Sequence, residues 1–257
     1  MKYKDLVFKI PVENSDYSEA SEYAIRSIEK IIKNAIDKGE NKIVINTNLK
    51  HGLPMENINK IAGPFVEAWA CETFVNILDN VDNEWNLINV EALERLNRAD
   101  VLLQFKRNIK VNAIVTAEVD VKATAEDVVS SGKSPNITSF ARIRNAYVED
   151  SDYLFVILSL KHKVYSVRNQ KTKLMDGIME VFKYNAYDIK YLSEPDISYN
   201  PALGTGQLQI SDIHYVTIQK RSAWEFCQLL DKKYLASTKR TFNDWLELAN
   251  KLGWIKR

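Results

Sequence analysis

Apolar residues in the first part of the chain recur at the spacing of one helical face. Between Asp16 and Lys38 they include Ile25, Ile28, Ile32 and Ile36. Gly39 follows, and glycine is a common helix stop because it adopts a left-handed conformation without a steric penalty. The pattern therefore predicts an amphipathic helix over residues 16–38, whose apolar face packs against the core or against a partner subunit.

A short strand and a second helix are predicted next. Lys42 to Asn46 is β-branched and predicts a strand, and Lys50 to Asn59 predicts a loop because Gly52 and Pro54 interrupt it. Gly63-Pro64 then predicts a helix start, because proline fits the first helical turn. The stripe expected along one side of this helix consists of Phe65, Trp69, Thr73 and Ile77.

The middle of the chain has the pattern of β-strands. The polar stretch after Asn80 predicts a surface loop. Val101 to Phe105 and Ala113 to Lys122 predict two strands of an antiparallel hairpin, joined by a charged turn over Lys106 to Lys110. Tyr153 to Leu160 is the most apolar segment and predicts a central strand that is buried on both faces.

Two more helices are predicted in the C-terminal third, over residues 223–234 and 242–252. Helices and strands thus follow one another without a repeat or a linker-like segment. The sequence predicts the α/β fold class, with a mixed central sheet flanked by helices. We expect a single domain over residues 1–257.

Composition and charge exclude several classes of protein. The 257 residues include 35 Lys and Arg against 34 Asp and Glu, so the net charge of +1 provides no global field for nucleic acid or an anionic membrane. The two cysteines lie far apart and lack metal-binding spacing, which excludes a disulfide framework and a zinc site. Because the chain lacks a long apolar run, we expect a soluble, cytoplasmic protein with no membrane partner.

Charged side chains line one face of the predicted strand that ends at Lys122. Side chains alternate along a strand, so Glu118, Asp120 and Lys122 point to one face and the apolar residues between them to the other. Asp100 begins the partner strand, and the hairpin brings its carboxylate close to that of Asp120. A solvated face with cross-strand ion pairs would show the same pattern, so both interpretations stay open at this point.

Two carboxylates at the ends of adjacent strands make an oxygen-rich site for a hard cation such as Mg²⁺. We expect Asp100 and Asp120 to bind this metal together with the backbone carbonyl of Val121. A metal there polarises a phosphoryl oxygen and lowers the pKa of bound water, which is the chemistry of phosphodiester hydrolysis. Lys122 can orient that water or stabilise the developing charge. The pattern resembles the PD-(D/E)xK nuclease fold, with Ala99 at a position where proline is frequent.

Longer segments carry a more specific resemblance. They are Ile45 to Pro64, Asn86 to Leu96, Val119 to Thr124, Ser131 to Val148 and Ser198 to Val216. These segments resemble the HpaI-like type II restriction endonucleases, and AGPFVEAW, RADVLLQF, DVKAT and SPNITS are more weakly similar to the HincII-like enzymes. The resemblance implies a Mg²⁺-dependent homodimer that cuts palindromic double-stranded DNA to blunt ends. It further implies the site GTTAAC and a cognate DNA methyltransferase as functional partner.

The resemblance also implies roles for two further residues. Many nucleases of this fold carry a glutamate on the helix before the hairpin, where it assists the metal site, and Glu67 has that position here. An exposed surface charge is the alternative for Glu67. In the HincII-like pattern the asparagine of Pro-Asn-Ile lies at the DNA, and Asn136 is the corresponding residue.

Other polar residues around Asn136 suit the same contact. The segment from Ser131 predicts a loop that leads into a helix, with Lys133, Ser134, Asn136, Ser139, Arg142 and Arg144 along it. Asparagine pairs with adenine edges, and lysine or arginine with guanine edges or phosphates. Ser134 and Asn136 would alternatively serve only as helix caps.

A polar turn before the helix at 223–234 supplies a second set of candidates. Gln219, Lys220 and Arg221 match the groove-reading loop of the HincII-like pattern, although a solvated turn is the alternative. Lys161 to Lys173 contains basic residues and no acid, and would contact phosphates or form an exposed hairpin. Leu203 to Gln207 lacks the lysine of a phosphate-binding loop and predicts a turn beside the DNA or a plain loop.

Alternatives to a restriction endonuclease differ in how well they fit. A repair or junction-resolving nuclease of the same fold would carry the same catalytic residues. A DNA-binding protein without catalysis is disfavoured because Asp100, Asp120 and Lys122 occur together. A glycosidase that uses Glu118 and Asp120 is disfavoured because neighbours on one strand face do not flank a sugar ring from opposite sides.

Overall fold

The computed structural model describes residues 2–51, 55–80, 83–94, 97–108, 113–202 and 204–256, without the side chains of 55–57 and 108. It divides into two compact units. Unit 1 contains Met1–Glu19, Lys133–Phe155 and Asp188–Arg257, and unit 2 contains Ala20–Gly132 and Val156–Tyr187. The expectation of one domain over the whole chain stays a prediction.

Unit 2 is built on a six-stranded sheet with the strand order β1-β7-β6-β4-β3-β2. The strands are β1 (Lys42–Ile45), β2 (Leu87–Ala92), β3 (Val101–Asn108), β4 (Ala113–Ala125), β6 (Phe155–Arg168) and β7 (Met175–Asp188). β1 pairs with β7, β2 with β3, and β3 with β4, all antiparallel. The predicted hairpin is confirmed, but β3 continues through Asn108, so its turn begins later than predicted. Lys110 lies outside the described residues.

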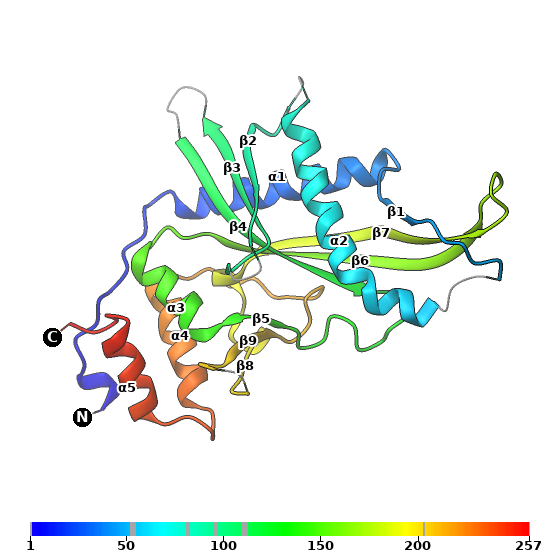
Figure 1. Cartoon of the computed structure of the whole chain (residues 1–257). Coiled ribbons are helices and arrows are strands. Elements are labelled where there is room, and N and C mark those ends of the chain that lie inside the picture. The colour runs from blue at the N-terminus through cyan, green and yellow to red at the C-terminus, as the bar shows by residue number, and fades with distance from the viewer. Residues whose placement is uncertain are drawn as a thin grey trace. The chain divides into compact units, whose positions relative to one another are not determined.

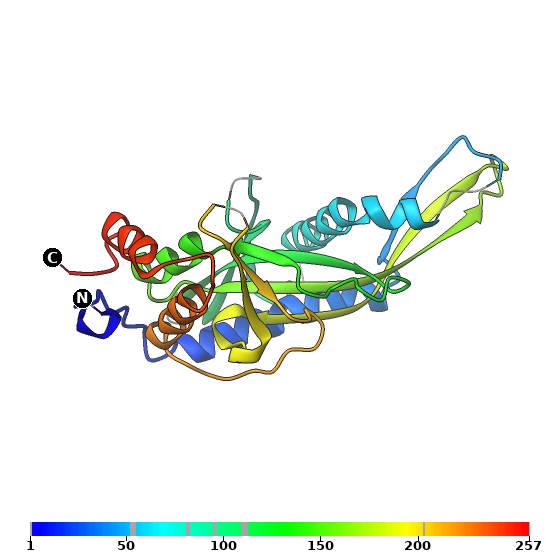
Figure 2. The same ribbon diagram turned by 90° about the horizontal axis from the view of Figure 1, so that it is seen from below.

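Two helices cover opposite faces of this sheet, as Figure 1 and Figure 2 show for α1 (Tyr17–Asp37) and α2 (Met55–Leu78). The prediction of α1 is confirmed, and Gly39 follows it with a φ of +77°. Tyr23 of α1 meets Phe105 of β3 edge to face, with ring centroids 6.3 Å apart. An α/β fold with a sheet between helices is therefore confirmed.

The start of α2 was predicted wrongly. The helix begins at Met55, so residues 55–59 are helical and Pro64 lies inside the helix. Gly52 and Pro54 lie outside the described residues. The buried stripe consists of Ile58, Ala62, Val66, Ala70, Phe74 and Ile77. Packing of Ile58 and Ala62 against Met179 of β7 favours helix before Pro64 despite the hydrogen bond that proline removes.

The central position of β6 agrees with its composition. All side chains from Phe155 to Leu160 are buried, as predicted for a strand covered on both faces. The basic segment from Lys161 onward forms the rest of β6 and the turn into β7. Strand β2 was missed, because its segment was interpreted as part of a polar loop.

Unit 1 combines a small sheet with α-helices. The strands are β5 (Asn136–Ser139), β8 (Ile197–Asn200) and β9 (Gln207–Ile210), in the order β5-β9-β8 and paired antiparallel. The helices are α3 (Phe140–Glu149), α4 (Ala223–Leu235) and α5 (Phe242–Lys251), with short 3-10 turns η1 (Tyr3–Asp5), η2 (Ile189–Tyr191) and η3 (Glu194–Asp196). The predictions of α4 and α5 are confirmed.

A buried ion pair lies in the core of unit 1. The Nε and Nη2 atoms of Arg144 each lie 3.2 Å from a carboxylate oxygen of Asp231, and the Arg144 side chain is fully buried. Trp245 donates its indole N–H to Asp231 at 2.9 Å. The prediction that Arg144 belongs to the DNA-contact segment was therefore wrong, because this core encloses its guanidinium.

Candidate functional site

The register of the β3–β4 hairpin places Asp100 beside Asp120. Val101 pairs with Val119, and Asp100 donates its backbone N–H to the Val119 carbonyl at 3.0 Å. The Oδ2 atom of Asp100 accepts a hydrogen bond from the backbone N–H of Val121 at 2.7 Å. The predicted hairpin thus brings Asp100 against the strand segment that carries Asp120.

Asp120 and Lys122 share one face of β4. The Nζ atom of Lys122 lies 2.8 Å from both carboxylate oxygens of Asp120, and Oδ1 accepts a hydrogen bond from it. Oδ2 is enclosed, and its 2.8 Å contact with the Lys122 ammonium is an ion pair without hydrogen-bond geometry. A buried carboxylate oxygen that accepts no hydrogen bond is stabilised by a neighbouring cation, and the Lys122 ammonium is the cation beside this atom.

The electrostatics of this pair are shifted by burial. Burial raises the pKa of Asp120 to about 7, with Lys122 opposing the shift and Asp100 adding to it. Burial lowers the pKa of Lys122, but the charges of Asp120, Asp100 and Glu67 together outweigh it, and the net result is a raised pKa. At neutral pH Lys122 is therefore protonated, whereas Asp120 is poised between its two protonation states.

Helix α2 contributes Glu67 to the same neighbourhood. Burial raises the pKa of Glu67, the charge of Asp100 raises it further, and Lys122 lowers it. The Glu67 carboxylate is thus within electrostatic range of the pair on the hairpin. In the part of the chain that the structure describes, no group of three or more His, Cys, Asp and Glu side chains could hold a metal. Glu67 therefore does not complete a three-carboxylate cluster.

The segment after Gly132 was predicted partly wrongly. It is a loop, as expected, but Asn136 begins strand β5 and helix α3 starts only at Phe140. Asn136 pairs with Gln209 of β9, which is distant in sequence. The local sequence pattern therefore did not predict strand β5. The N-cap of α3 is Ser139, so capping by Ser134 or Asn136 is not their role.

Several candidates on this segment already have protein partners. Lys133 forms an ion pair with Asp212, and Lys133 keeps 57% of its side chain exposed. The hydroxyl of Ser139 lies 2.9 Å from that of Thr205. Contact of Lys133 or Ser139 with DNA would therefore exchange a protein partner for a DNA partner.

The remaining residues of the segment lie at the surface. Asn136 is exposed and accepts a hydrogen bond from Asn200 at 3.5 Å. Ser134 is exposed, has a φ of +46°, and accepts a hydrogen bond at its carbonyl from Gln209 at 2.9 Å. Arg142 is exposed on α3. The surface position of these residues is compatible with the predicted contact.

The polar turn at Gln219 lies directly before α4, as predicted. Gln219 and Lys220 are exposed, and Lys220 donates to the Ser18 hydroxyl at 2.7 Å. Arg221 is half-buried and donates through Nη2 to the Gln219 side chain at 3.3 Å, while its Nη1 is enclosed without a hydrogen-bond partner among the described residues. Burial lowers the pKa of Arg221. This turn is held by specific side chains and is more than a solvated connection.

The glycine-containing segment after β8 behaves as a plain turn. The hydroxyl of Tyr199 donates to the Thr205 carbonyl at 2.8 Å, and Arg240 donates to the Gly204 carbonyl at 2.6 Å. Leu203 lies outside the described residues. Because side chains of the protein bind these carbonyls, the turn has the structure expected of a connection and not that of a phosphate-binding loop.

The predicted residues fall into two groups. The catalytic candidates lie in unit 2, and the DNA-contact candidates lie in unit 1. None of the helices that the structure describes has both the length and the apolar character needed to cross a bilayer.

Comparison with known proteins identifies the class to which this chain belongs. The chain matches the model of the family "Type II restriction endonuclease HpaI" over residues 4–253. It is 58% identical over 256 residues to the Type II restriction enzyme HpaI of Haemophilus parainfluenzae, with 100% of both chains covered. The protein is thus a site-specific endonuclease by class. More narrowly, the chain belongs to the HpaI family of type II restriction endonucleases.

A solved structure gives a weaker match. The NlaIV restriction endonuclease aligns with 87% of this chain and 95% of its own, at a TM-score of 0.40 and 12% sequence identity. The family assignment rests on the two sequence comparisons and not on this alignment.

Proposed function

We propose that this restriction endonuclease hydrolyses double-stranded DNA in a Mg²⁺-dependent reaction at the palindrome GTTAAC, with a blunt cut at GTT/AAC. The observation that carries the Mg²⁺ dependence is the buried Oδ2 atom of Asp120, which accepts no hydrogen bond among the described residues and has the Lys122 ammonium as its counter-ion. The recognition sequence rests on the similarity to HpaI. We further propose that the hairpin and its flanking helices form a PD-(D/E)xK core.

The donor set fits a magnesium ion. Asp100 and Asp120 offer carboxylate oxygens, and the N–H of Val121 faces Asp100. In an antiparallel ladder the N–H and C=O of one residue face the same neighbour, which directs the Val121 carbonyl to that side too. Proteins commonly hold Mg²⁺ with one or two carboxylates, water and substrate phosphate, so a third carboxylate is not required. When bound, the metal would polarise a phosphoryl oxygen and lower the pKa of a bound water.

Lys122 would act as a hydrogen-bond donor. Its pKa is raised by Asp120 despite the opposing effect of burial, so its ammonium does not take a proton from water near neutral pH. With Nζ 2.8 Å from Asp120, it is placed to orient the attacking water or to bind a phosphoryl oxygen that gains negative charge. Lys122 would thus stabilise the transition state electrostatically.

Glu67 would assist at the edge of the site. The charges of Asp100 and Lys122 act on its carboxylate. Because its pKa is raised, the carboxyl group favours a hydrogen bond to a water molecule over direct contact with another anion. We therefore assign Glu67 the positioning of water beside the metal site.

Residues of unit 1 would bind the DNA. The set consists of Lys133, Ser134, Asn136, Ser139, Arg142, Gln219, Lys220 and Arg221. Asparagine, glutamine, arginine and Lys220 would read base edges, and Lys133 would bind phosphates. Because the two halves of a palindrome are identical, a homodimer would read one half with each subunit. A cognate DNA methyltransferase would protect the host genome.

Digestion of a sequenced plasmid tests this function. With Mg²⁺ we expect linear fragments whose sequenced ends are blunt and lie at GTTAAC, and with EDTA in place of Mg²⁺ we expect intact plasmid. A plasmid from which the sequence has been removed is the matched control and should stay uncut. Staggered ends, cleavage at unrelated sequences, or full activity in EDTA would contradict the proposal. Preferential cutting of four-way junctions without sequence dependence would support the junction nuclease instead.

A further inference from the structure

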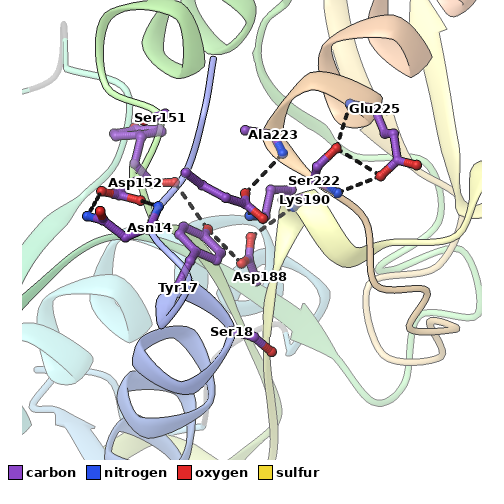
Figure 3. A network of polar contacts seen from close by, with 12 residues as sticks. Asn14, Tyr17, Ser18, Ser151, Asp152, Asp188, Lys190, Ser222, Ala223 and Glu225 are labelled. Carbon is purple, nitrogen blue, oxygen red and sulfur yellow. Dashed lines mark hydrogen bonds and ion pairs between the residues drawn. The ribbon is translucent and has the colours of Figure 1, made fainter. Parts of the chain in front are cut away.

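A fully buried lysine lies in unit 1 near the turn that carries Gln219. Lys190 belongs to η2, its side chain is 0% exposed, and its Nζ forms an ion pair with Glu13. Nζ also lies 3.1 Å from the centroid of the Tyr17 ring, which Figure 3 shows beside it. An ammonium group is costly to bury unless it is paired, and the contacts with Glu13 and Tyr17 compensate the buried charge of Lys190.

The carboxylate of Glu13 holds two segments together. Its Oε2 accepts a hydrogen bond from Lys190 and another, at 3.0 Å, from the backbone N–H of Ala223, the first residue of α4. The first N–H groups of a helix lack partners within the helix and favour a negative charge. The Lys190–Glu13 pair therefore fixes the point at which the Gln219 turn enters α4.

The other end of the same turn is fixed next to Lys190. The backbone N–H of Gln219 donates to the carbonyl of Tyr191 at 2.7 Å, and Leu192 and Ile218 form an isolated bridge. Tyr191, which follows Lys190 in the chain, thus holds the start of the segment from Gln219 to Ser222. Glu13, the ion-pair partner of Lys190, binds the N–H of Ala223 directly after the end of this segment.

Two buried residues keep Lys190 in place. Asp188 accepts a hydrogen bond from the backbone N–H of Lys190 at 2.9 Å and another from the Tyr17 hydroxyl at 2.8 Å, as the dashed lines of Figure 3 show. Asp188 and Tyr17 are both buried. The backbone of η2 and the aromatic ring under the ammonium are therefore joined by one carboxylate.

We propose that Lys190 is a positioning residue for base readout. Through Glu13 and Tyr191 it holds Gln219, Lys220 and Arg221 in the arrangement that discriminates between DNA sequences. This inference rests on the proposed readout role of that turn. Base discrimination depends on donors and acceptors at fixed positions, so loosening their support lowers selectivity even when every readout side chain is present.

The variant Lys190→Met tests the proposal, because it keeps an unbranched side chain and removes the charge. The measurement is the ratio of kcat/KM for a duplex with the cleaved plasmid sequence to kcat/KM for duplexes with one base pair changed. We expect this ratio to fall about tenfold, within the range that one lost base discrimination produces. A smaller folded fraction lowers both values equally, so the ratio does not respond to stability alone.

The variant Asp231→Asn is a matched control for a buried ion pair on α4. Its partners Arg144 and Trp245 lie outside the readout turn. We expect a lower melting temperature and an unchanged ratio. A ratio that falls as much in Asp231→Asn as in Lys190→Met would overturn the positioning role, because general loosening of unit 1 would then explain both.

The double variant Lys190→Met with Glu13→Gln separates positioning from stability. The glutamine oxygen still accepts from Ala223, and no unpaired charge is left, so we expect the melting temperature to recover relative to Lys190→Met. The ratio should stay low, because the tie between η2 and α4 is lost. Recovery of the ratio together with stability would overturn the proposal. The single variant Glu13→Gln, which should also lower the ratio, serves if Lys190→Met does not fold.

Parallel variants of the turn distinguish this inference from the function on which it rests. Gln219→Ala, Lys220→Ala and Arg221→Ala should lower the same ratio. If they do and Lys190→Met and Glu13→Gln do not, the positioning role is wrong and the readout role stands. If none of the three changes the ratio, the readout role is wrong, and the positioning role is overturned with it.

Discussion

The two units hold their candidate residues in opposite ways. In unit 2, Asp120 is buried at 4% exposure and is held, with Lys122, by the strand β4 itself. In unit 1, Gln219 and Lys220 are exposed on a turn that is held from outside by buried side chains of other segments. The difference follows from the tasks: a strong electrostatic site must be shielded from water, whereas a base reader must face the solvent from which DNA arrives.

This comparison has a testable consequence. Changes in unit 2 should lower the rate of cleavage while binding to the recognition sequence is kept. Changes in unit 1 should alter binding and selectivity while the chemical step is kept.

The largest effect is expected for Asp120→Ala. This variant lacks the buried oxygen proposed to hold the metal, so cleavage should fall by about a thousandfold or more while specific DNA binding is retained. Cleavage assays in Mg²⁺ and binding assays in EDTA measure the two properties. Glu118→Ala is the control, because Glu118 points to the same strand face but pairs in register with Leu102 and not with Asp100. Wild-type cleavage by Asp120→Ala would refute the site.

Lys122→Met should have the next largest effect. Loss of the ammonium should lower the rate by about a hundredfold or more, in the range found for other single charge-stabilising donors. Lys122 lowers the pKa of Asp120 in the wild-type protein, and therefore the pKa of Asp120 should rise in this variant. The pH–rate profile should therefore move to higher pH. An unchanged profile together with a near-normal rate would remove Lys122 from the mechanism.

The site in unit 2 could be predicted because its determinants are local. Alternation along one strand puts Asp120 and Lys122 on the same face, and a hairpin brings the start of β3, with Asp100, to them. The same local rules predicted α1, α4 and α5. The start of α2 was missed because Pro64 indicated a helix start, and nothing local shows that Ile58 packs on Met179.

The determinants of unit 1 could not be predicted, because they depend on partners distant in sequence. A lysine such as Lys190, or an arginine such as Arg144, has the sequence pattern of a surface charge. Their burial is decided by Glu13 and Asp231, which are far away along the chain. Strand β5 likewise forms on β9, so its residues indicated a helix when considered alone.

A smaller effect is expected at Lys133. Its ion pair with Asp212 must open when Lys133 binds a phosphate, so Lys133→Met should weaken DNA binding by up to about tenfold and reduce the salt dependence by about one ion. Asp212→Asn is the matched opposite change, because it removes the competing carboxylate. We expect tighter binding by that variant. Titrations over a range of salt concentrations measure both, and equal weakening by the two variants would show that the pair acts only as a structural support.

The smallest effect is expected in the stability of the metal-free enzyme. Burial raises the pKa of Asp120 from 3.8 to about 7, so the folded state holds this proton more tightly than the unfolded state. The contribution to stability is complete below the lower value and is lost as the pH rises through about 7. Asp120→Asn cannot ionise and escapes this loss.

In EDTA, the melting temperature of Asp120→Asn should exceed that of the wild type by a few degrees at pH 8, since each kcal/mol corresponds to about 2–4 °C in a chain of this size. The gain should shrink steadily as the pH is lowered toward 4. Differential scanning calorimetry of both proteins across this range measures it, with Glu118→Gln as the control for loss of a carboxylate on the same strand. A gain of equal size at every pH would mean that Asp120 ionises without penalty, and the contrast between a buried, desolvated site in unit 2 and a supported turn in unit 1 would no longer hold.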